Sequence, residues 1–550
     1  MTAPPEPVGP PPTPPPAELY AQLAIAGLFL VALTLRIFAA AMLGPHVDEA
    51  ESVMASKIAA VQGIPLLPSG VLFLQGFTLT YLNIPFLSLV SDPLALFPLR
   101  IITAVAGAMA VPMLYVAART LNTSRAVAVF AAAVLTFDAV SIQWSAHVRP
   151  YALLQFLTLA LIALSTHAIA RPSAGRLVGL SALFAFAVFT HVGVVIILPA
   201  MLLLTWLRHG FQPRAVWLTF VSFLIAPTAF LTLNSVYGVS TKGTDAVGPT
   251  FIGDHLIDLT RFLSPKLSGW QSLFAKSGVH DLMLVLVPLA IGFLVARRLF
   301  DQRDAWLDLL APLAHYVLPI TFVMLFTTGD LPRYLLHVHP LAFVFVGMAL
   351  EDLVLRPAGG DVERRLWRAL AGIGGVVVVS YMLDGTYRRF HDPVVDPSYQ
   401  AGLRYLLPRH QAGEPVISAM TSVTWLSPLR ASDTWFLAGP ADSPRSTRYA
   451  RRRPDGAMVD YWSGVPALTS TAELCSFLEA HPGTWILVDK DRMNGEWALG
   501  KRMSNAIIGA SIRVHSGIGE ARVYRSNPRE SWTSIAVEAC SSTPLPSEDE

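Results

Sequence analysis

Two adjacent carboxylates, Asp48 and Glu49, follow closely on a long apolar run, residues 19–43. Gly44 and Pro45 break the helix predicted for that run, and after Asp48 the apolar residues recur at helical spacing. This spacing predicts an amphipathic helix on the membrane surface, with both acids in its first turn. A carboxylate held there can act as a base in catalysis. The alternative is an ordinary acidic helix start, which the helix dipole favours.

Arginine and aromatic residues occur in two further stretches, Trp144-Ser-Ala-His-Val-Arg-Pro-Tyr151 and Gly329-Asp-Leu-Pro-Arg-Tyr-Leu-Leu-His-Val-His339. The planar fork of Arg149 or Arg333 suits a phosphate, because it can bind two oxygens at once. The alternative is an arginine that reaches bulk lipid head groups. Both arginines together with a carboxylate on the same side of the membrane favour a phosphate-bearing lipid substrate.

Several histidines are weaker candidates. His46 beside Asp48 could add a divalent metal site, since imidazole and carboxylate both bind such ions, although a histidine that binds no metal is the favoured interpretation. His191 could line a cavity or lie in a plain loop. His337 and His339 are two residues apart on a predicted helix and do not share a face, so polar lining is favoured over metal binding.

The composition indicates what must position these groups. The chain has 550 residues, of which 53% are hydrophobic and only 14% charged, well below the charged fraction of soluble proteins. The apolar residues come in runs of about twenty, the length that spans a bilayer. A polytopic α-helical protein of the cell membrane is therefore predicted. The net charge of +2 is too small to indicate a nucleic-acid partner.

Arginine-rich loops set the expected topology. Residues 71–90 are apolar enough to cross, but a full crossing would place five basic loops outside, so a surface-lying or re-entrant segment is predicted. About eleven spans remain, with the N-terminus in the cytoplasm. In order they are residues 19–43, 99–118, 126–143, 151–170, 177–207 (two short spans meeting near His191), 215–233, 282–296, 305–327, 335–355 and 369–383.

The domain organisation follows from changes in composition. Residues 1–17 are expected to form a disordered proline-rich tail, and residues 18–384 a transmembrane domain whose first outer loop covers 44–98. Residues 385–540 are expected to fold as an extracytoplasmic α/β domain, with strands near 415–419 and 484–489 and a helix at 470–480. Residues 541–550 are expected to form a second disordered tail. Cys475 and Cys540 could pair on that side of the membrane, or could be two small buried residues.

Three of these motifs resemble the GT-C superfamily of membrane glycosyltransferases, which includes the protein O-mannosyltransferases and the lipid A aminoarabinose transferase. They are Asp48-Glu-Ala50 after the first span, Ser145-x-x-x-Arg-Pro-Tyr-Ala152, and Pro332-Arg-Tyr-Leu-Leu336. The resemblance covers roughly residues 19–350. The chain departs from the family pattern, because its first outer loop lacks a Lys-Pro-Pro-Leu stretch. The most similar stretch there is Ile64-Pro-Leu-Leu-Pro68. The role of that lysine is therefore not transferred.

The resemblance implies transfer of a sugar from a polyprenyl-phosphate donor to an acceptor hydroxyl on the outer face of the membrane. It implies Asp48 as general base, with Glu49 as second choice. It also implies that Arg149 and Arg333 stabilise the leaving phosphate and that Tyr334 donates a hydrogen bond to it. His147, Tyr151 and His191 are expected to line the substrate site. Metal use differs within the superfamily, and the acceptor is a cell-envelope glycan, a glycolipid or a protein. A lipid or polysaccharide transporter or flippase without chemistry is the alternative function.

Overall fold

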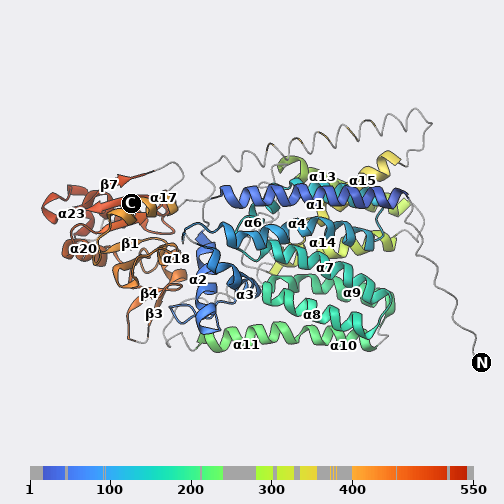
Figure 1. Cartoon of the computed structure of the whole chain (residues 1–550), viewed down its shortest axis with the longest axis horizontal. Helices are drawn as coiled ribbons and strands as arrows, with labels where there is room; N and C mark the ends of the chain where they lie inside the picture. The colour runs from blue at the N-terminus through green and yellow to red at the C-terminus, as the bar shows by residue number, and fades with distance from the viewer. Residues whose placement is uncertain are drawn as a thin grey trace, which may run out of the picture.

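The computed structural model describes residues 16–43, 47–90, 92, 94–210, 214–239, 280–300, 306–326, 335–355, five single positions between 369 and 384, and then 399–453, 455–516 and 521–541. Long helices lie side by side in a bundle, and a sheet region, residues 399–541, sits at one end of it (Figure 1).

Helices make up the described chain as far as residue 355. In order they are α1 (Pro16–Met42), α2 (Val47–Gln62), α3 (Phe77–Asn83), η1 (Ile84–Leu89), α4 (Phe97–Thr120), α5 (Arg125–Phe137), α6 (Ala139–Ser145), α7 (Tyr151–Ala170), α8 (Ala174–Thr190), η2 (Val192–Ile197), α9 (Leu198–His209), α10 (Arg214–Phe223), α11 (Ile225–Val239), α13 (His280–Phe300), α14 (Trp306–Phe326) and α15 (Leu341–Leu355).

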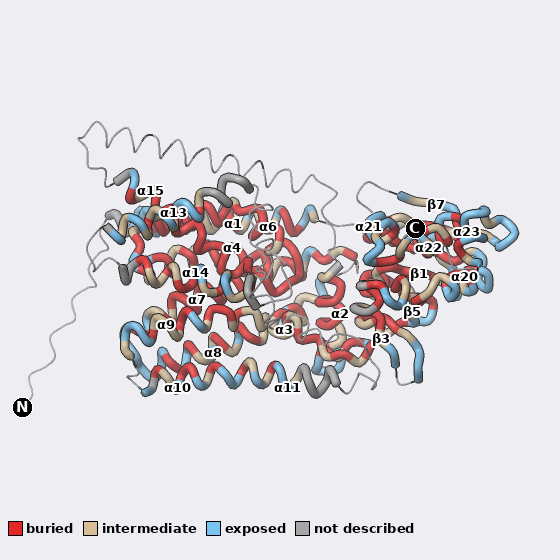
Figure 2. Tube along the Cα trace, turned by 180° about the vertical axis from the view of Figure 1, so that it is seen from behind, coloured by how far each residue is buried: buried red, intermediate tan, exposed pale blue. Residues whose placement is uncertain are grey.

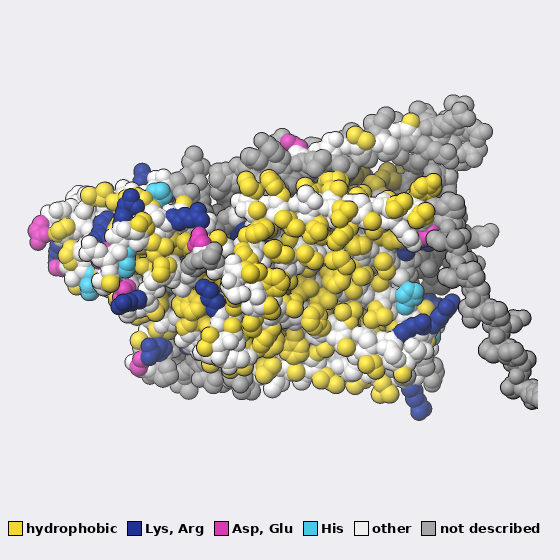
Figure 3. Space-filling view, viewed as in Figure 1, with side chains coloured by type: hydrophobic (Ala, Val, Ile, Leu, Met, Phe, Trp, Pro, Cys, Tyr) yellow, Lys and Arg dark blue, Asp and Glu magenta, His cyan; other side chains and the backbone are white. Residues whose placement is uncertain are grey.

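Five helices among the described residues are long and apolar enough to cross a membrane, or six if α5 and α6 count as one bent span. Hydrophobic side chains cover the face of the bundle seen in Figure 3, as a lipid-facing surface requires. The chain is therefore a membrane protein, although the count of eleven spans is not reached in this part of the chain. The expected span at 369–383 lies almost entirely outside the described residues.

Two details of the predicted spans agree with the structure. The long apolar run at 177–207 divides at His191, which separates α8 from η2 and α9. Within residues 71–90 the structure has the apolar helical segment Phe77–Leu89, α3 followed by η1. Thirteen helical residues are too few for a bilayer, which takes about twenty. This segment therefore does not cross as a single helix, which agrees with the sequence prediction.

Helix α2 is more enclosed than its amphipathic pattern predicts. Ala50, Val53 and Met54 are fully buried, and so are the polar residues Glu49 and Ser56, which are therefore not open to water. It packs against α3 on one side and against α18 (Thr421–Leu426) of the sheet region on the other (Figures 1 and 2). The polar side chains of α2 form hydrogen bonds inside the protein. The amphipathic pattern, which suggests contact with water, is therefore explained by internal hydrogen bonding.

A bend of 60° separates α5 from α6. Asp138 lies at the bend and caps α6, since its carboxylate accepts a hydrogen bond of 2.9 Å from the Ser141 backbone N–H. The break interrupts the regular hydrogen bonding of the last carbonyls of α5, and only a long bond of 3.4 Å from the Asp138 backbone N–H reaches the Leu135 carbonyl from the local backbone. Arg36 of α1, which is fully buried, supplies donors there: its Nη2 lies 3.2 Å from the Leu135 carbonyl and its Nη1 3.3 Å from the Thr136 carbonyl.

The sheet region contains a six-stranded sheet in the order β5-β2-β1-β6-β8-β7. The first four of these strands are parallel, and β8 and β7 join antiparallel. The strands are β1 (Val416–Ser418), β2 (Thr434–Leu437), β5 (Ala467–Leu468), β6 (Trp485–Val488), β7 (Ser511–His515) and β8 (Arg522–Ser526), with β3 (Ala450–Arg452) and β4 (Met458–Asp460) forming a separate hairpin. Strands β1 and β6 lie where the sequence predicts strands.

Helices pack around this sheet: α17 (Tyr399–Leu406), α18, α19 (Pro444–Tyr449), α20 (Thr471–Ala480), α21 (Lys490–Asn494), α22 (Gly500–Ala510) and α23 (Ser534–Cys540). One hydrophobic core joins β1, β2 and β6 to α20 and α22. Cys475 and Cys540 form a disulfide that ties α20 to α23, which decides between the two alternatives that the sequence leaves open.

Candidate functional site

Glu49 lies in the first turn of α2, and its side chain is fully buried. Arg100 of α4 holds both carboxylate oxygens, with Nε 2.8 Å from Oε1 and Nη2 2.7 Å from Oε2. The Val148 backbone N–H donates to Oε1 at 2.7 Å, and His147 Nδ1 lies 3.3 Å from Oε2. Both oxygens are therefore engaged by groups from other segments.

Neighbouring positive charge and burial shift the pKa of the Glu49 carboxyl in opposite directions. Burial alone would raise the pKa of Glu49, but the Arg100 guanidinium and His147 outweigh it and hold the pKa well below its ordinary range. Glu49 is thus an ionised carboxylate inside the protein, stabilised by bidentate pairing with an arginine.

Asp48 has a different environment one residue earlier. Its side chain is 22% exposed, against 0% for Glu49, because successive helical residues point about 100° apart. Arg149 faces it from the turn between α6 and α7, with Nη2 3.4 Å from Asp48 Oδ2. Arg149 Nη1 also donates to the Asp48 backbone carbonyl at 3.0 Å. The structure therefore brings together an accessible carboxylate and an arginine that lie about a hundred residues apart.

The sequence interpretation missed three members of this cluster. Arg149 Nη1 lies 3.4 Å from Ser52 Oγ and 3.9 Å from Glu51 Oε2, both on α2. Their signal in the sequence is helical spacing, since Glu51 and Ser52 follow Asp48 at positions i+3 and i+4. Arg100, the third, stands at the start of a predicted span, where a lone arginine requires a partner inside the protein.

Aromatic rings lie beside Arg149. The ring centroids of Trp144 and Tyr151 are 4.8 Å apart, those of Tyr151 and His191 5.5 Å, and those of Trp144 and His147 6.1 Å. The Arg149 guanidinium lies 5.8 Å from the Tyr151 ring centroid. His147, Tyr151 and His191 are thus gathered around one place, although His191 lies far from the other two in the sequence.

Other candidates are placed elsewhere or lie outside the described residues. His46, Arg333 and Tyr334 are outside them. His337 and His339 are buried, and His339 Nε2 lies 3.7 Å from Asp138 Oδ1 at the bend. Within the described chain no three His, Cys, Asp or Glu residues are grouped to hold a metal ion.

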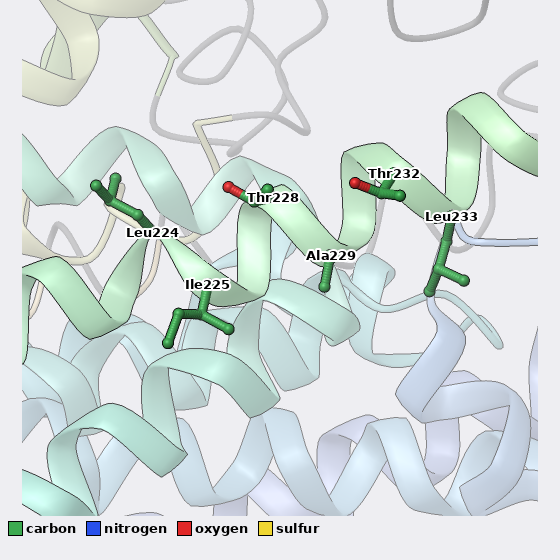
Figure 4. Close-up of a pocket in the computed structure, with 6 residues that line it drawn as sticks. All are labelled: Leu224, Ile225, Thr228, Ala229, Thr232 and Leu233. Carbon is green, nitrogen blue, oxygen red and sulfur yellow. The ribbon is translucent and has the colours of Figure 1, made fainter.

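An open groove lies at the junction of α10 and α11 (Figure 4). Its lining is apolar except for two threonine hydroxyls, and it comprises Leu224, Ile225, Thr228, Ala229, Thr232 and Leu233. None of these residues can transfer a proton or neutralise a phosphate at neutral pH. The cluster around Asp48 and Arg149 is therefore the candidate site.

The helical bundle with its terminal sheet region has the fold of the GT-C membrane glycosyltransferases. One similar structure is that of ArnT from Cupriavidus metallidurans bound to undecaprenyl phosphate, with a TM-score of 0.57 at 14% identity over 94% of this chain and 99% of ArnT. Another is the archaeal oligosaccharyltransferase AglB from Archaeoglobus fulgidus in complex with an inhibitory peptide and a dolichol-phosphate. Its TM-score is 0.53 at 12% identity, over 95% of this chain and 77% of AglB. No protein-family model and no curated protein sequence matches the chain.

Proposed function

We propose that this protein is a membrane glycosyltransferase that moves a sugar from a polyprenyl-phosphate donor to an acceptor hydroxyl on the extracytoplasmic face. The observation that carries the proposal is the placement of the partly exposed Asp48 carboxylate against the buried Arg149, with 3.4 Å between Oδ2 and Nη2. A base and a phosphate-binding cation are the two groups that this reaction requires next to each other. The solved structures of the same fold contain undecaprenyl phosphate in ArnT and a dolichol-phosphate in AglB, which supports this donor class.

The proposed reaction needs only one carboxylate. The acceptor oxygen attacks the anomeric carbon and gives its proton to Asp48, while the bond from that carbon to the phosphate oxygen breaks. Polyprenyl phosphate leaves with the electron pair. Phosphate is a good leaving group and needs no general acid, whereas glycosidases usually employ two carboxylates because they must protonate a poor one. Arg149 stabilises charge on the departing phosphate, and Arg333 and Tyr334 are proposed to contact the same group.

The choice of Asp48 rather than Glu49 as base follows from their partners. Glu49 is fully buried and both of its oxygens accept hydrogen bonds from Arg100. A carboxylate with a strongly lowered pKa is a weak base, and an acceptor hydroxyl would have to displace an arginine to reach it. Asp48 keeps an exposed fraction of 22%, which leaves room for an approaching hydroxyl.

The extracytoplasmic location is supported by the positions of the arginines. Arg119 ends α4 and Arg125 begins α5, while Arg171 and Arg176 flank the α7–α8 turn. Cytoplasmic loops are enriched in such residues, and these turns lie at the end of the bundle away from α2 and the sheet region (Figure 1). The Cys475–Cys540 disulfide suits an oxidising compartment on the other side.

The test is to incubate the purified protein with undecaprenyl phosphate that carries a radiolabelled hexose or pentose and to measure release of undecaprenyl phosphate. Release that depends on an added membrane-lipid or glycan acceptor is expected. Binding of the donor, or its movement between bilayer leaflets, without release from any donor–acceptor pair would instead favour the transporter function. The described site groups gather near the sheet region rather than halfway along the bundle, which is unlike the midplane sites of transporters.

A further inference from the structure

The Glu49–Arg100 pair joins four segments of the chain at one place. Besides its two bonds to Glu49, Arg100 donates through Nη1 to the carbonyls of Ala40 at 2.9 Å and Leu43 at 2.5 Å, at the end of α1. Glu49 in turn accepts from the Val148 backbone at 2.7 Å. The pair thus links the end of α1 and the starts of α2 and α4 to the turn before α7.

Asp48 and Arg149, the two groups that act in the proposed reaction, stand next in the sequence to Glu49 and Val148. Asp48 precedes Glu49 and Arg149 follows Val148, so the Glu49–Val148 bond fixes one chain segment against the other a single residue away from Asp48 and Arg149. Because Glu49 points into the protein and Asp48 about 100° away, the buried bond sets where Asp48 stands relative to Arg149. Arg100 is itself only 3% exposed, so the fixed point lies in packed protein.

We propose that Glu49 and Arg100 are positioning residues, which hold the base Asp48 and the phosphate-binding Arg149 at their working separation without contacting substrate. The inference rests on the proposed function. Its physical basis is that reacting groups must be held close to their productive geometry, and a displacement of about 1 Å can lower a rate about a hundredfold. A bidentate arginine–carboxylate pair fixes distance and direction together, which a single hydrogen bond does not.

The experiment compares Glu49→Gln, Arg100→Lys and the double variant with wild type in single-turnover transfer across a pH series. Each single variant is expected to lower turnover about ten- to a hundredfold while donor affinity changes less. The double variant should be about as slow as the slower single variant, since residues that act as one unit do not add. The acid limb of the pH profile should remain in all three, because the proposed base Asp48 is unchanged.

A matched control is Glu414→Gln. Glu414 Oε1 pairs with Arg525 Nη2 at 2.5 Å and Glu414 Oε2 accepts from Trp485 Nε1 at 2.9 Å, so the variant breaks a similar arginine–carboxylate pair in the sheet region. It should leave both turnover and the pH profile unchanged.

Three outcomes overturn the inference. Wild-type turnover in Glu49→Gln would show that the pair positions nothing, and loss of the acid limb in Glu49→Gln would make Glu49 the base. Losses that multiply in the double variant would show that the two residues act independently. If Glu49→Gln does not fold, the same pH series is measured on Arg100→Lys, which keeps the buried positive charge. Its turnover and acid limb then test the inference. If the wild type releases no lipid phosphate from any donor, the proposed function itself is wrong. The results with the variants test only the positioning role of Glu49 and Arg100.

Discussion

At the scale of single residues, two neighbouring acids have opposite environments. Glu49 is enclosed by Arg100, His147 and the Val148 backbone, whereas Asp48 keeps an accessible edge beside Arg149. One acidic side chain is therefore held in a buried ion pair, while the acidic side chain next to it keeps an accessible edge.

Asp48→Asn keeps the size of the side chain and removes the base. Turnover should fall by about two to four orders of magnitude, and donor affinity should hold, because a carboxylate does not attract the donor phosphate. Single-turnover transfer and donor binding by the same purified variant measure the two effects. Asp491→Asn, which changes an acid in the first turn of another helix, serves as control and should behave as wild type. Full activity of Asp48→Asn would leave Asp48 as a helix start only.

Arg149→Ala should weaken donor binding and also lower turnover, because charge on the phosphate grows as the bond breaks. Arg149→Lys should restore only part of both, since a planar fork becomes a point charge. Equilibrium binding of labelled donor to the two variants provides the measurement. The control is Arg404→Ala, whose side chain is 60% exposed and pairs with Asp92. Equal donor affinity in wild type and both Arg149 variants would contradict the assignment.

Composition and short motifs were enough to single out Asp48, Arg149 and Tyr151, because polar residues are conspicuous in an apolar chain. The partners of Glu49 were not predictable in the same way. Arg100 stands alone at the start of an apolar run, and Val148 contributes only a backbone N–H, which no side-chain pattern reveals. Helical spacing could have placed Glu51 and Ser52 on the face of Asp48, but it could not have shown that Arg149 reaches them.

At the scale of elements, α2 is one of the contacts between the bundle and the sheet region. Met54 and Ala55 of α2 pack in one buried cluster with Leu67, Phe73 and Trp462, and the Phe73 and Trp462 ring centroids are 6.2 Å apart. The amphipathic pattern of α2 predicted the helix correctly. The pattern could not show that α18 and Trp462 pack on α2, because these residues come from nearly four hundred residues later in the chain.

Trp462→Ala tests this contact. Removing a buried tryptophan should lower the free energy of unfolding by about 3–5 kcal/mol and should also slow transfer, because α2 carries Asp48. A denaturant titration of the purified protein together with single-turnover transfer measures both. Trp497→Ala, at a position that is 45% exposed, is the matched control. A Trp462→Ala protein with unchanged stability and turnover would show that the sheet region does not support α2.

At the scale of the whole molecule, all proposed chemistry lies at the end of the bundle that carries the sheet region (Figure 1). The order of helices up to α9 follows the predicted spans closely, since hydrophobic runs and basic turns mark them. The sheet order could not be predicted, because β5, β2, β1 and β6 meet through contacts between distant segments. The GT-C likeness that three short motifs suggested is confirmed as a likeness of fold.

Single added cysteines test the orientation of this molecule in the membrane. Ser124→Cys and Ser173→Cys, at the turns before α5 and α8, should resist a membrane-impermeant thiol reagent in intact cells. Ser432→Cys, at an exposed position of the sheet region, should react. The native cysteines can stay, because Cys475 and Cys540 are joined in a disulfide. Labelling of Ser124→Cys or Ser173→Cys from outside would reverse the orientation.

Arg36 has a consequence for how the protein is made. The carbonyl partners of this buried arginine at the end of α5 stand 99 and 100 residues further along the chain. An arginine inside a lone inserted helix is unfavourable, by about 2.5–3.5 kcal/mol at the helix centre and by less nearer the end, where Arg36 stands. Helix α1 therefore enters the bilayer with a penalty that α5 later offsets. Nascent chains truncated before α5 should therefore resist alkaline extraction from membranes less well than chains truncated after α6. Insertion of the first helix is in this sense completed only by the arrival of the third span, rather than one helix at a time.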